Sequence, residues 1–129
     1  MESKFEIVEE ELLEDVAGGE FGGSEHTTTV TEANYASFIH SAVNVVVLFG
    51  VSWSGTCVRA SELMEECAVK YSKVRVGIFE VTDSEFLMYK LGIKNVPTSI
   101  RYKHGIEVNR VEGTQRITNL FKMYKNPGV

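Results

Sequence analysis

The strongest constraint on the fold is an almost unbroken apolar run from Val43 to Val51, which stops at a loop and is followed by a helical pattern. Such a run is typical of a strand that is buried on both faces, in the middle of a sheet. A strand that ends at small residues and leads into a helix leaves free backbone N–H groups and the positive end of the helix at the turn. The turn is therefore a favourable position for a thiolate.

The loop at this turn matches a Cys-x-x-Cys redox motif with one sulfur missing. Its sequence is Trp53-Ser54-Gly55-Thr56-Cys57. In a complete motif both end positions are cysteines, and a low thiol pKa makes one of them reactive. Here the first position is Ser54, so only the thiol of Cys57 remains for chemistry at this loop.

From residue 27 onward the hydrophobic pattern alternates between the strand period and the helix period. We expect strands at 27–30, 43–51, 73–81, 98–103 and 106–111, and helices at 32–42, from the loop to about 71, at 84–91 and at 115–125. Thr31 and Ser84 are suitable helix N-caps, Gly92 can end the third helix, and His104-Gly105 suits a tight turn. The pattern predicts an α/β fold in the order β-α-β-α-β-α-β-β-α.

Length and composition narrow the class of protein. A chain of 129 residues fits one domain with one core, and two cysteines are too few for a disulfide scaffold. No apolar run approaches the roughly 18–20 residues that span a bilayer. The weak, dispersed positive charge after residue 20 gives no footprint for nucleic acid. The histidines form no cluster at metal-ligand spacing, so we expect no metal or other cofactor.

The first 20 residues differ from the rest of the chain, because they carry eight acids and one base. The pairs Gly18-Gly19 and Gly22-Gly23 mark a flexible joint. We therefore expect an N-terminal extension over 1–23 and a folded domain over 24–129. Apolar residues recur in the extension at steps of three and four and predict one face of a short helix. They are Phe5, Val8, Leu12, Leu13 and Val16.

This extension resembles the double-glycine leader peptides of exported bacterial peptides, in which an acidic amphipathic helix ends at Gly-Gly. Val16, Leu13 and Val8 lie about four, seven and twelve positions before a cut after Gly19, as in that family. The resemblance implies docking to a peptidase-containing ABC transporter, cleavage after Gly19, and export of the remainder. The alternative is an acidic tail that only aids solubility.

Residues 27–125 resemble the thioredoxin family. Three separated features carry the resemblance: the Trp53 to Cys57 loop, the segment Val96-Pro97-Thr98, and Gly113. They match, in order and spacing, the family's Trp-Cys-Gly-Pro-Cys loop, its Ile-Pro-Thr segment with a cis proline, and a late glycine. The resemblance implies the thioredoxin fold, a central mixed β-sheet flanked by helices, with all three features at one redox face.

The resemblance also implies roles at that face. Ser54 takes the position of the nucleophilic cysteine at an exposed helix start, and Cys57 takes that of the resolving thiol. Serine cannot replace the nucleophile, because an alcohol does not exchange with a disulfide. The Val96–Pro97 bond should be cis, with the Val96 backbone offered to an extended peptide. The expected substrate-binding residues are Trp53, Gly55, Thr56, Val96, Pro97 and Gly113, with Ile93 to Asn95 along the same groove.

Two departures weaken this comparison with an active thioredoxin. The family carries a buried acid before the loop and a lysine in the next central strand, where this chain has Leu48 and about Ile78. Proton transfer to Cys57 would then depend on water or on Glu80. Cys67 is expected to be a small core residue, because free cysteine is often buried.

The sequence therefore predicts a bacterial thioredoxin-like thiol–disulfide exchange protein that does not complete dithiol turnover as written. Ser54 is either an engineered replacement that traps exchange, the origin we favour because the rest of the loop matches a working site, or the mark of a natural redox-silent paralogue. A peptide-binding module without exchange is the alternative function, as is an exported accessory protein for a disulfide-containing peptide. The expected partners are an extended protein or peptide disulfide and a thioredoxin-reductase-type reductant, in the cytoplasm unless cleavage leads to export.

Overall fold

The computed structural model describes residues 5–7 and 21–124. Its elements, in chain order, are β1 (Glu6–Ile7), β2 (Thr28–Val30), α1 (Tyr35–Ile39), β3 (Asn44–Gly50), α2 (Gly55–Lys70), β4 (Arg75–Glu80), a 3-10 turn (Val81–Asp83), α3 (Glu85–Leu91), β5 (Asn95–Val96), β6 (Thr98–Lys103), β7 (Ile106–Glu112) and α4 (Ile117–Phe121). The expected order from β2 onward is confirmed, with the short strand β5 added before β6.

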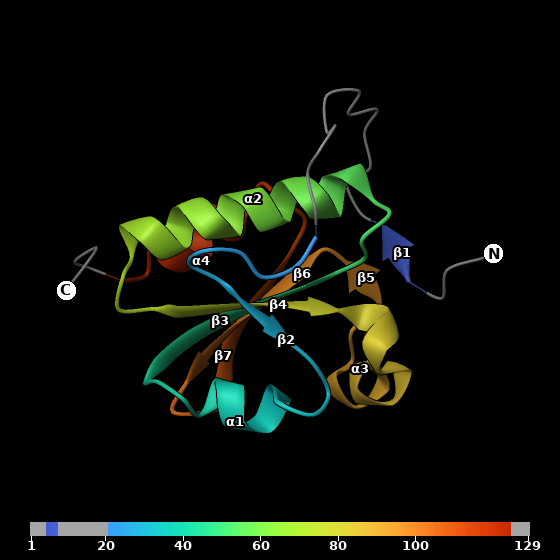
Figure 1. Cartoon of the computed structure of the whole chain (residues 1–129), viewed down its shortest axis with the longest axis horizontal. Coiled ribbons are helices and arrows are strands. Elements are labelled where there is room, and N and C mark those ends of the chain that lie inside the picture. Colours follow the sequence, from blue (N-terminus) through green and yellow to red (C-terminus); the bar gives the residue numbers. More distant parts are fainter. Residues whose placement is uncertain (1–4, 8–20, 125–129) are drawn as a thin grey trace.

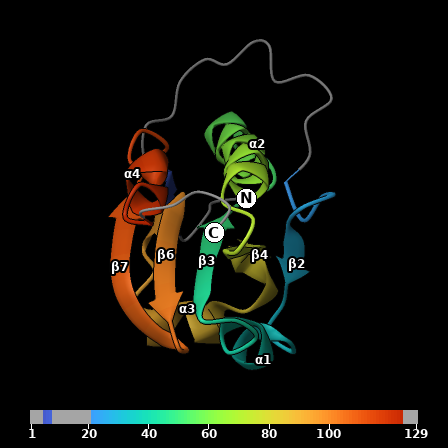
Figure 2. The ribbon, with the colours of Figure 1, turned by 90° about the vertical axis from the view of Figure 1, so that its left-hand side faces the viewer.

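The central sheet has the strand order β2-β4-β3-β6-β7. Strands β2, β4 and β3 are parallel, and β6 and β7 run antiparallel to their neighbours. Helices α2 and α4 cover one face of this mixed sheet and α1 and α3 cover the other, as Figures 1 and 2 show. The expected mixed sheet flanked by helices is therefore present.

Strand β3 is buried on both faces, as its apolar run predicts. Val45, Val47 and Phe49 belong to the hydrophobic cluster on the side of α1 and α3. The alternate residues Val46 and Leu48 belong to the cluster under α2 and α4. Successive side chains of a strand point to opposite faces, so this one strand contributes to both halves of the core.

The predicted start of the first helix at Glu32, with Thr31 as its cap, is wrong. Helix α1 begins at Tyr35, and its N-cap residue Asn34 makes no side-chain capping bond. The Asn34 Oδ1 atom instead accepts a hydrogen bond from the Thr31 N–H at 2.7 Å. This bond closes a turn over residues 31–34, and side chains of this kind compete with the helix for backbone groups.

The predicted ends of α3 are confirmed. The Ser84 Oγ atom accepts a hydrogen bond from the Leu87 N–H at 3.1 Å, and Gly92 ends the helix at φ +70°. Helix α4 is shorter than the predicted 115–125, since it covers Ile117–Phe121. Turns replace its first and last residues within the described part of the chain, as the bonds from Ile117 N to Thr114 O and from Tyr124 N to Phe121 O indicate.

The expected helix of the N-terminal extension is wrong where the structure describes it. Glu6 and Ile7 form β1, which pairs in parallel with Asn95 and Val96 of β5. An isolated short helix is marginal in water, and a strand edge offers these residues backbone partners that a helix face does not. The other predicted residues of that helix and the Gly18-Gly19 pair lie outside the described residues.

The packing of β4 against α1 can be tested at Gly77. A Cβ atom at this position would lie 2.6 Å from Phe38 Cε2 and would also overlap the Val30 side chain. We expect Gly77→Ala to lower the free energy of unfolding by about 1–3 kcal/mol, measured by urea denaturation, because overpacking forces neighbours to shift. Val69→Ala on the exposed side of α2 is the control, with an expected change within about 0.5 kcal/mol. An unchanged stability of Gly77→Ala would contradict this packing.

Candidate functional site

Ser54 is the N-cap of α2, and its side chain is buried rather than presented to solvent. The Ser54 Oγ atom accepts a hydrogen bond from the Cys57 N–H at 3.2 Å, and the Ser54 carbonyl accepts one from Val58 N at 3.0 Å. Only 2% of the residue is exposed. The expected exposed position of Ser54 is therefore wrong, because the hydroxyl points back along the helix start to satisfy a backbone donor.

Cys57 lies one helical turn further in and is fully buried, with 0% of its surface exposed. Its Sγ atom lies beside the end of β3, since a Cβ atom built on Gly50 would be 3.0 Å from it. The same Cβ position would be 2.8 Å from Cε1 of Phe21, a residue of the N-terminal extension. The thiol is thus enclosed where the strand end, the start of α2 and Phe21 meet.

Trp53 precedes the cap and is exposed over 58% of its surface, so it is a surface aromatic and not part of the core. Its neighbour Ser52 is held by Glu80, whose Oε1 atom accepts a hydrogen bond from the Ser52 N–H at 2.8 Å. The second oxygen of Glu80 accepts a bond from the Thr82 hydroxyl at 2.9 Å. Glu80 therefore has a structural task in holding the loop that the sequence did not reveal.

Pro97 and Gly113 are brought together from different strands. The Val96–Pro97 peptide bond is cis, as the family resemblance implies. The Pro97 carbonyl accepts a hydrogen bond from the Gly113 N–H at 2.9 Å, and Gly113 has φ +88°. This left-handed conformation is one that glycine adopts without steric cost. Val96 and Cys57 belong to the same hydrophobic cluster, so this turn and the loop meet at one part of the core.

The two positions that replace the family's buried acid and lysine are apolar and adjacent. Leu48 of β3 and Ile78 of β4 are partners in the sheet, and both are fully buried in the cluster under α2. Neither side chain can carry a proton. Among the described residues, Glu80 is the carboxylate tied to this loop, through the Ser52 N–H.

No disulfide joins the two cysteines, Cys57 and Cys67, which do not have Cys-x-x-Cys spacing. Both lie on α2, ten residues and therefore roughly 15 Å apart along the axis, which is too far for a disulfide. Cys67 is buried, as expected for a core residue. Burial raises the pKa of the Cys67 thiol to about 11, with Glu66 adding to the rise and Lys70 opposing it. This thiol is therefore protonated at neutral pH and unsuited to exchange.

The residues that the structure describes contain no group of three side chains that could hold a metal ion. None of the helices in that part of the chain is long and apolar enough to cross a membrane.

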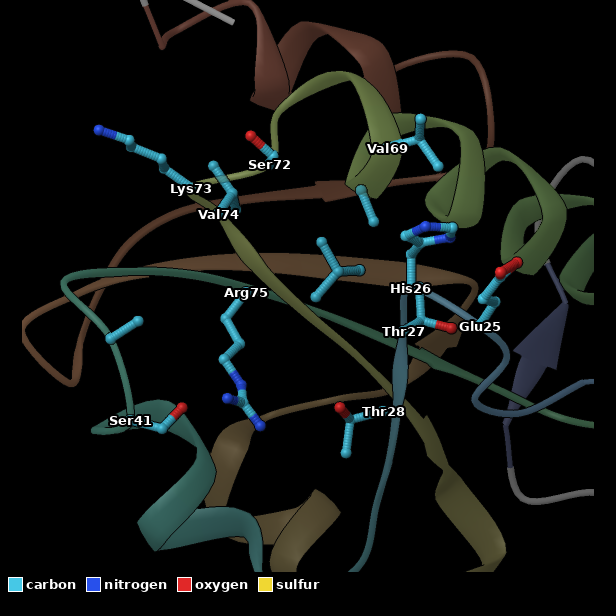
Figure 3. A pocket seen from close by; sticks show the side chains of 13 residues that line it. Glu25, His26, Thr27, Thr28, Ser41, Val69, Ser72, Lys73, Val74 and Arg75 are labelled. Atoms are coloured by element: carbon cyan, nitrogen blue, oxygen red, sulfur yellow. The ribbon is translucent and has the colours of Figure 1, made fainter. Parts of the chain in front are cut away.

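A hollow of about 710 Å³ lies at the other end of α2 from Ser54 (Figure 3). His26, Lys73 and Arg75 line it, and none of the predicted site residues does. The His26 N–H donates to Glu65 Oε2 at 2.9 Å. The pKa of Glu65 is lowered, because hydrogen bonds from His26 outweigh the opposing effect of burial. The Arg75 guanidinium stacks over Phe38 at 5.3 Å. His26 and Arg75 therefore have structural partners around the hollow.

The strand β1 beside Val96 is the part of this region that the sequence analysis missed. The Glu6 N–H donates a hydrogen bond to the Lys94 carbonyl at 3.1 Å, and Phe5 and Ile7 pack against the cluster that contains Cys57 and Val96. The alternation of apolar, acidic and apolar residues over 5–7 was the available signal. It was outweighed by the helical spacing of the residues that follow.

Comparison with known proteins agrees with this architecture. The thioredoxin of Plasmodium falciparum superposes with a TM-score of 0.69 at 29% identity, covering 74% of this chain and 97% of that one. The structure therefore has the thioredoxin fold. The thioredoxin of Staphylococcus saprophyticus is 33% identical over 92 residues, covering 70% of this chain and 88% of the relative. The thioredoxin of Chlamydia caviae is 29% identical over 94 residues, covering 73% and 91%.

The thioredoxin family model matches residues 26–126, and the chain belongs to this family. Membership implies disulfide-containing proteins as the class of partner. Family membership does not determine the reaction, which depends on the side chains of the loop. There the structure has the buried thiol of Cys57 and the hydroxyl of Ser54, which caps α2.

The capping role of Ser54 predicts a stability effect that is separate from any redox role. We expect Ser54→Ala to lower the free energy of unfolding by about 0.5–2 kcal/mol, because it leaves a helix N–H without its acceptor. Ser52→Ala is the matched control: it removes an exposed hydroxyl two residues away, and the interaction of Ser52 with Glu80 uses the backbone. Equal urea-denaturation midpoints for the two variants would contradict the cap.

Proposed function

We propose that this chain is a thioredoxin-family thiol–disulfide exchange protein whose loop, as written, does not complete dithiol turnover. The observation that carries the proposal is Ser54, whose hydroxyl lies where the family has its nucleophilic sulfur and is bonded to the Cys57 N–H at 3.2 Å. An alcohol neither ionises near neutral pH nor attacks a disulfide. The first step of exchange therefore has no nucleophile at this position.

Cys57 alone supports only half of an exchange cycle. If its thiolate attacks a substrate disulfide, one sulfur of the substrate bonds to Cys57 and the other leaves as a thiolate. Release of the bound substrate would need a second protein thiol, and Cys67 lies roughly 15 Å away along α2. The cycle then stops at the mixed disulfide unless an external thiol resolves it. The full burial of Cys57 also slows the attack.

The substrate face in this proposal consists of the Trp53 to Thr56 loop and the turn at Val96 and Pro97, with Gly113 behind the turn. Exposed Trp53 supplies apolar surface for a bound chain. The backbone of Val96 lies in β5, at the edge that pairs with β1, where an extended peptide can add as a strand in place of β1. A protein or peptide disulfide in extended conformation is the proposed partner, with a thioredoxin-reductase-type reductant for the active form.

Restoring the sulfur tests the proposal. In an insulin-reduction assay with dithiothreitol, we expect the unsubstituted chain with Ser54 to stay at background and Ser54→Cys to catalyse precipitation of the insulin B chain. The introduced thiol would attack insulin, and Cys57 would then displace the reduced chain and form the protein disulfide. Ser54→Cys combined with Cys57→Ala is the control and should turn over far more slowly, because only dithiothreitol can then resolve its mixed disulfide.

No activity in a folded Ser54→Cys variant would contradict the exchange proposal. It would favour the second candidate function, a redox-silent peptide-binding module. In such a module Ser54 has a structural role without redox chemistry, because its buried hydroxyl caps α2. The same assay bears on the origin of Ser54. If Ser54 is an engineered replacement, Ser54→Cys should recover full insulin-reduction activity. If the site has diverged naturally, with Leu48 and Ile78 in place of proton carriers, Ser54→Cys should recover only weak insulin-reduction activity.

The N-terminal extension over 1–23 is proposed to act as a double-glycine leader ahead of a domain over 24–129. Support comes from the acidic composition and from the spacing of Val8, Leu13 and Val16 before Gly19. In this proposal a peptidase-containing ABC transporter binds the extension and exports the domain as an accessory to a disulfide-containing peptide. Without cleavage the chain would remain in the cytoplasm.

Incubation with a leader-specific peptidase domain should cut the full chain after Gly19, with the product mass read by mass spectrometry. Gly18→Pro should abolish the cut, because proline lacks the backbone N–H and restricts φ beside the scissile bond. A control leader peptide in the same reaction reports on the peptidase. A full chain that stays intact while the control is cut would contradict the leader proposal.

A further inference from the structure

The chain places its own N-terminal residues on the edge where a partner peptide is proposed to bind. Strand β1 pairs in parallel with β5, with Glu6 opposite Asn95 and Ile7 opposite Val96. The Glu6 N–H donates to the Lys94 carbonyl at 3.1 Å. Figure 1 shows β1 beside β5, at the end of the molecule where α2 begins. Within the described residues, β1 is the strand that pairs with β5, in a two-stranded sheet of their own.

The side chains of this segment alternate as those of a bound strand should. Phe5 and Ile7 are partly buried against the cluster that contains Ile93, Val96 and Cys57, whereas Glu6 is exposed. Backbone bonds to a strand edge give affinity, and alternate side chains entering pockets give selectivity. The segment thus has the pattern of a ligand added to the sheet.

Phe5 forms one wall of a hollow of about 450 Å³, whose other walls are α3 and the segment 92–94 that leads to β5. Two aromatic side chains on its rim are largely exposed, Phe86 at 66% and Tyr89 at 85%. Met88 and Ile93 also line it. An apolar hollow with an exposed aromatic rim favours a large apolar side chain, and Phe5 uses only part of the aromatic surface that is offered.

We propose that Phe5-Glu6-Ile7 occupies the peptide-binding edge of β5 in cis, and that a partner binds by displacing it. The inference rests on the proposed peptide site at Val96 and Pro97, and it defines the class of partner. The partner supplies an extended segment with an aromatic residue for the Phe5 hollow, an exposed residue, and an aliphatic residue over Val96. Access to the Cys57 loop is then controlled by the same chain that carries it.

The contact is small enough to be reversible. Besides the pairing of β1 with β5, the contact has one backbone hydrogen bond, from Glu6 N to Lys94 O. Its two apolar side chains, Phe5 and Ile7, are only partly buried. The segment is part of the same chain, so it competes at an effective concentration on the order of millimolar. If the segment itself binds with a dissociation constant of about 0.1 mM, a competing peptide binds roughly tenfold more weakly to the occupied chain.

Glu6→Pro tests the proposal in the full chain, because proline lacks the N–H that bonds to Lys94. Glu6→Gln is the matched control, since it removes the charge and keeps the N–H. The probe is a fluorescein-labelled synthetic peptide with the sequence of residues 2–10, measured by fluorescence anisotropy in the presence of reductant. We expect Glu6→Pro to bind the probe about tenfold more tightly than the wild type, and Glu6→Gln to bind as the wild type does. A probe with aspartate in place of Phe5 and Ile7 should not bind any of the chains.

Phe5→Asp in the full chain is the second variant. It leaves the backbone bond possible but removes the side chain from the hollow, and it should also strengthen binding of the unmodified probe. Far-ultraviolet circular dichroism checks that each variant is folded. Equal probe affinity in the wild type, Glu6→Pro and Phe5→Asp would overturn self-occupancy and leave the proposed peptide site intact. Binding to none of the folded chains would overturn the peptide site itself. Because no covalent step is measured, neither result depends on the insulin assay.

Discussion

The hydrogen-bonded pairing of β3 with β4 on one side and β6 on the other is the interaction on which the rest of the structure depends. Every residue from Val45 to Gly50 has a partner in β4, and most have one in β6. The strand supplies alternate side chains to both halves of the core. Because β3 is fixed in this way, the place where it stops is also fixed, and the loop and α2 begin at a rigid point.

The site follows from where three backbone segments end. The end of β3 leads to Ser54, whose hydroxyl caps α2, and the first turn of α2 places Cys57 beside Gly50. The cis turn at Pro97 is held by the Gly113 N–H. Strand β5 precedes that turn, and its edge carries β1. The thioredoxin fold is thus retained, and Ser54, Glu80 and Gly113 each hold a backbone group of this region by a hydrogen bond.

Local sequence patterns predicted most of the helices and strands, whereas the features that were missed depend on contacts that the sequence does not specify. The apolar run of β3, the Ser84 cap and the Gly92 stop each depend on neighbours in sequence, so they were predictable. The burial of Ser54 was not, because a serine at a helix start can face solvent or cap the helix with the same sequence. The strand at Glu6 was missed because the helical spacing of the following residues outweighed the short alternation over 5–7, and that alternation does not identify the partner Asn95, 89 positions away. The start of α1 was also mispredicted, because the sequence does not show that the Asn34 side chain accepts a hydrogen bond from Thr31 and forms a turn there.

The central claim is that the edge beside Pro97 is a strand-binding site that this chain fills with its own N-terminal residues. The most direct measurement is amide hydrogen exchange of the full wild-type chain, followed residue by residue by NMR. The account predicts that the Glu6 amide exchanges at least several-fold more slowly than in an unstructured peptide, with a nuclear Overhauser contact between Ile7 and Val96. Exchange of Glu6 at the unstructured rate, without that contact, would contradict it.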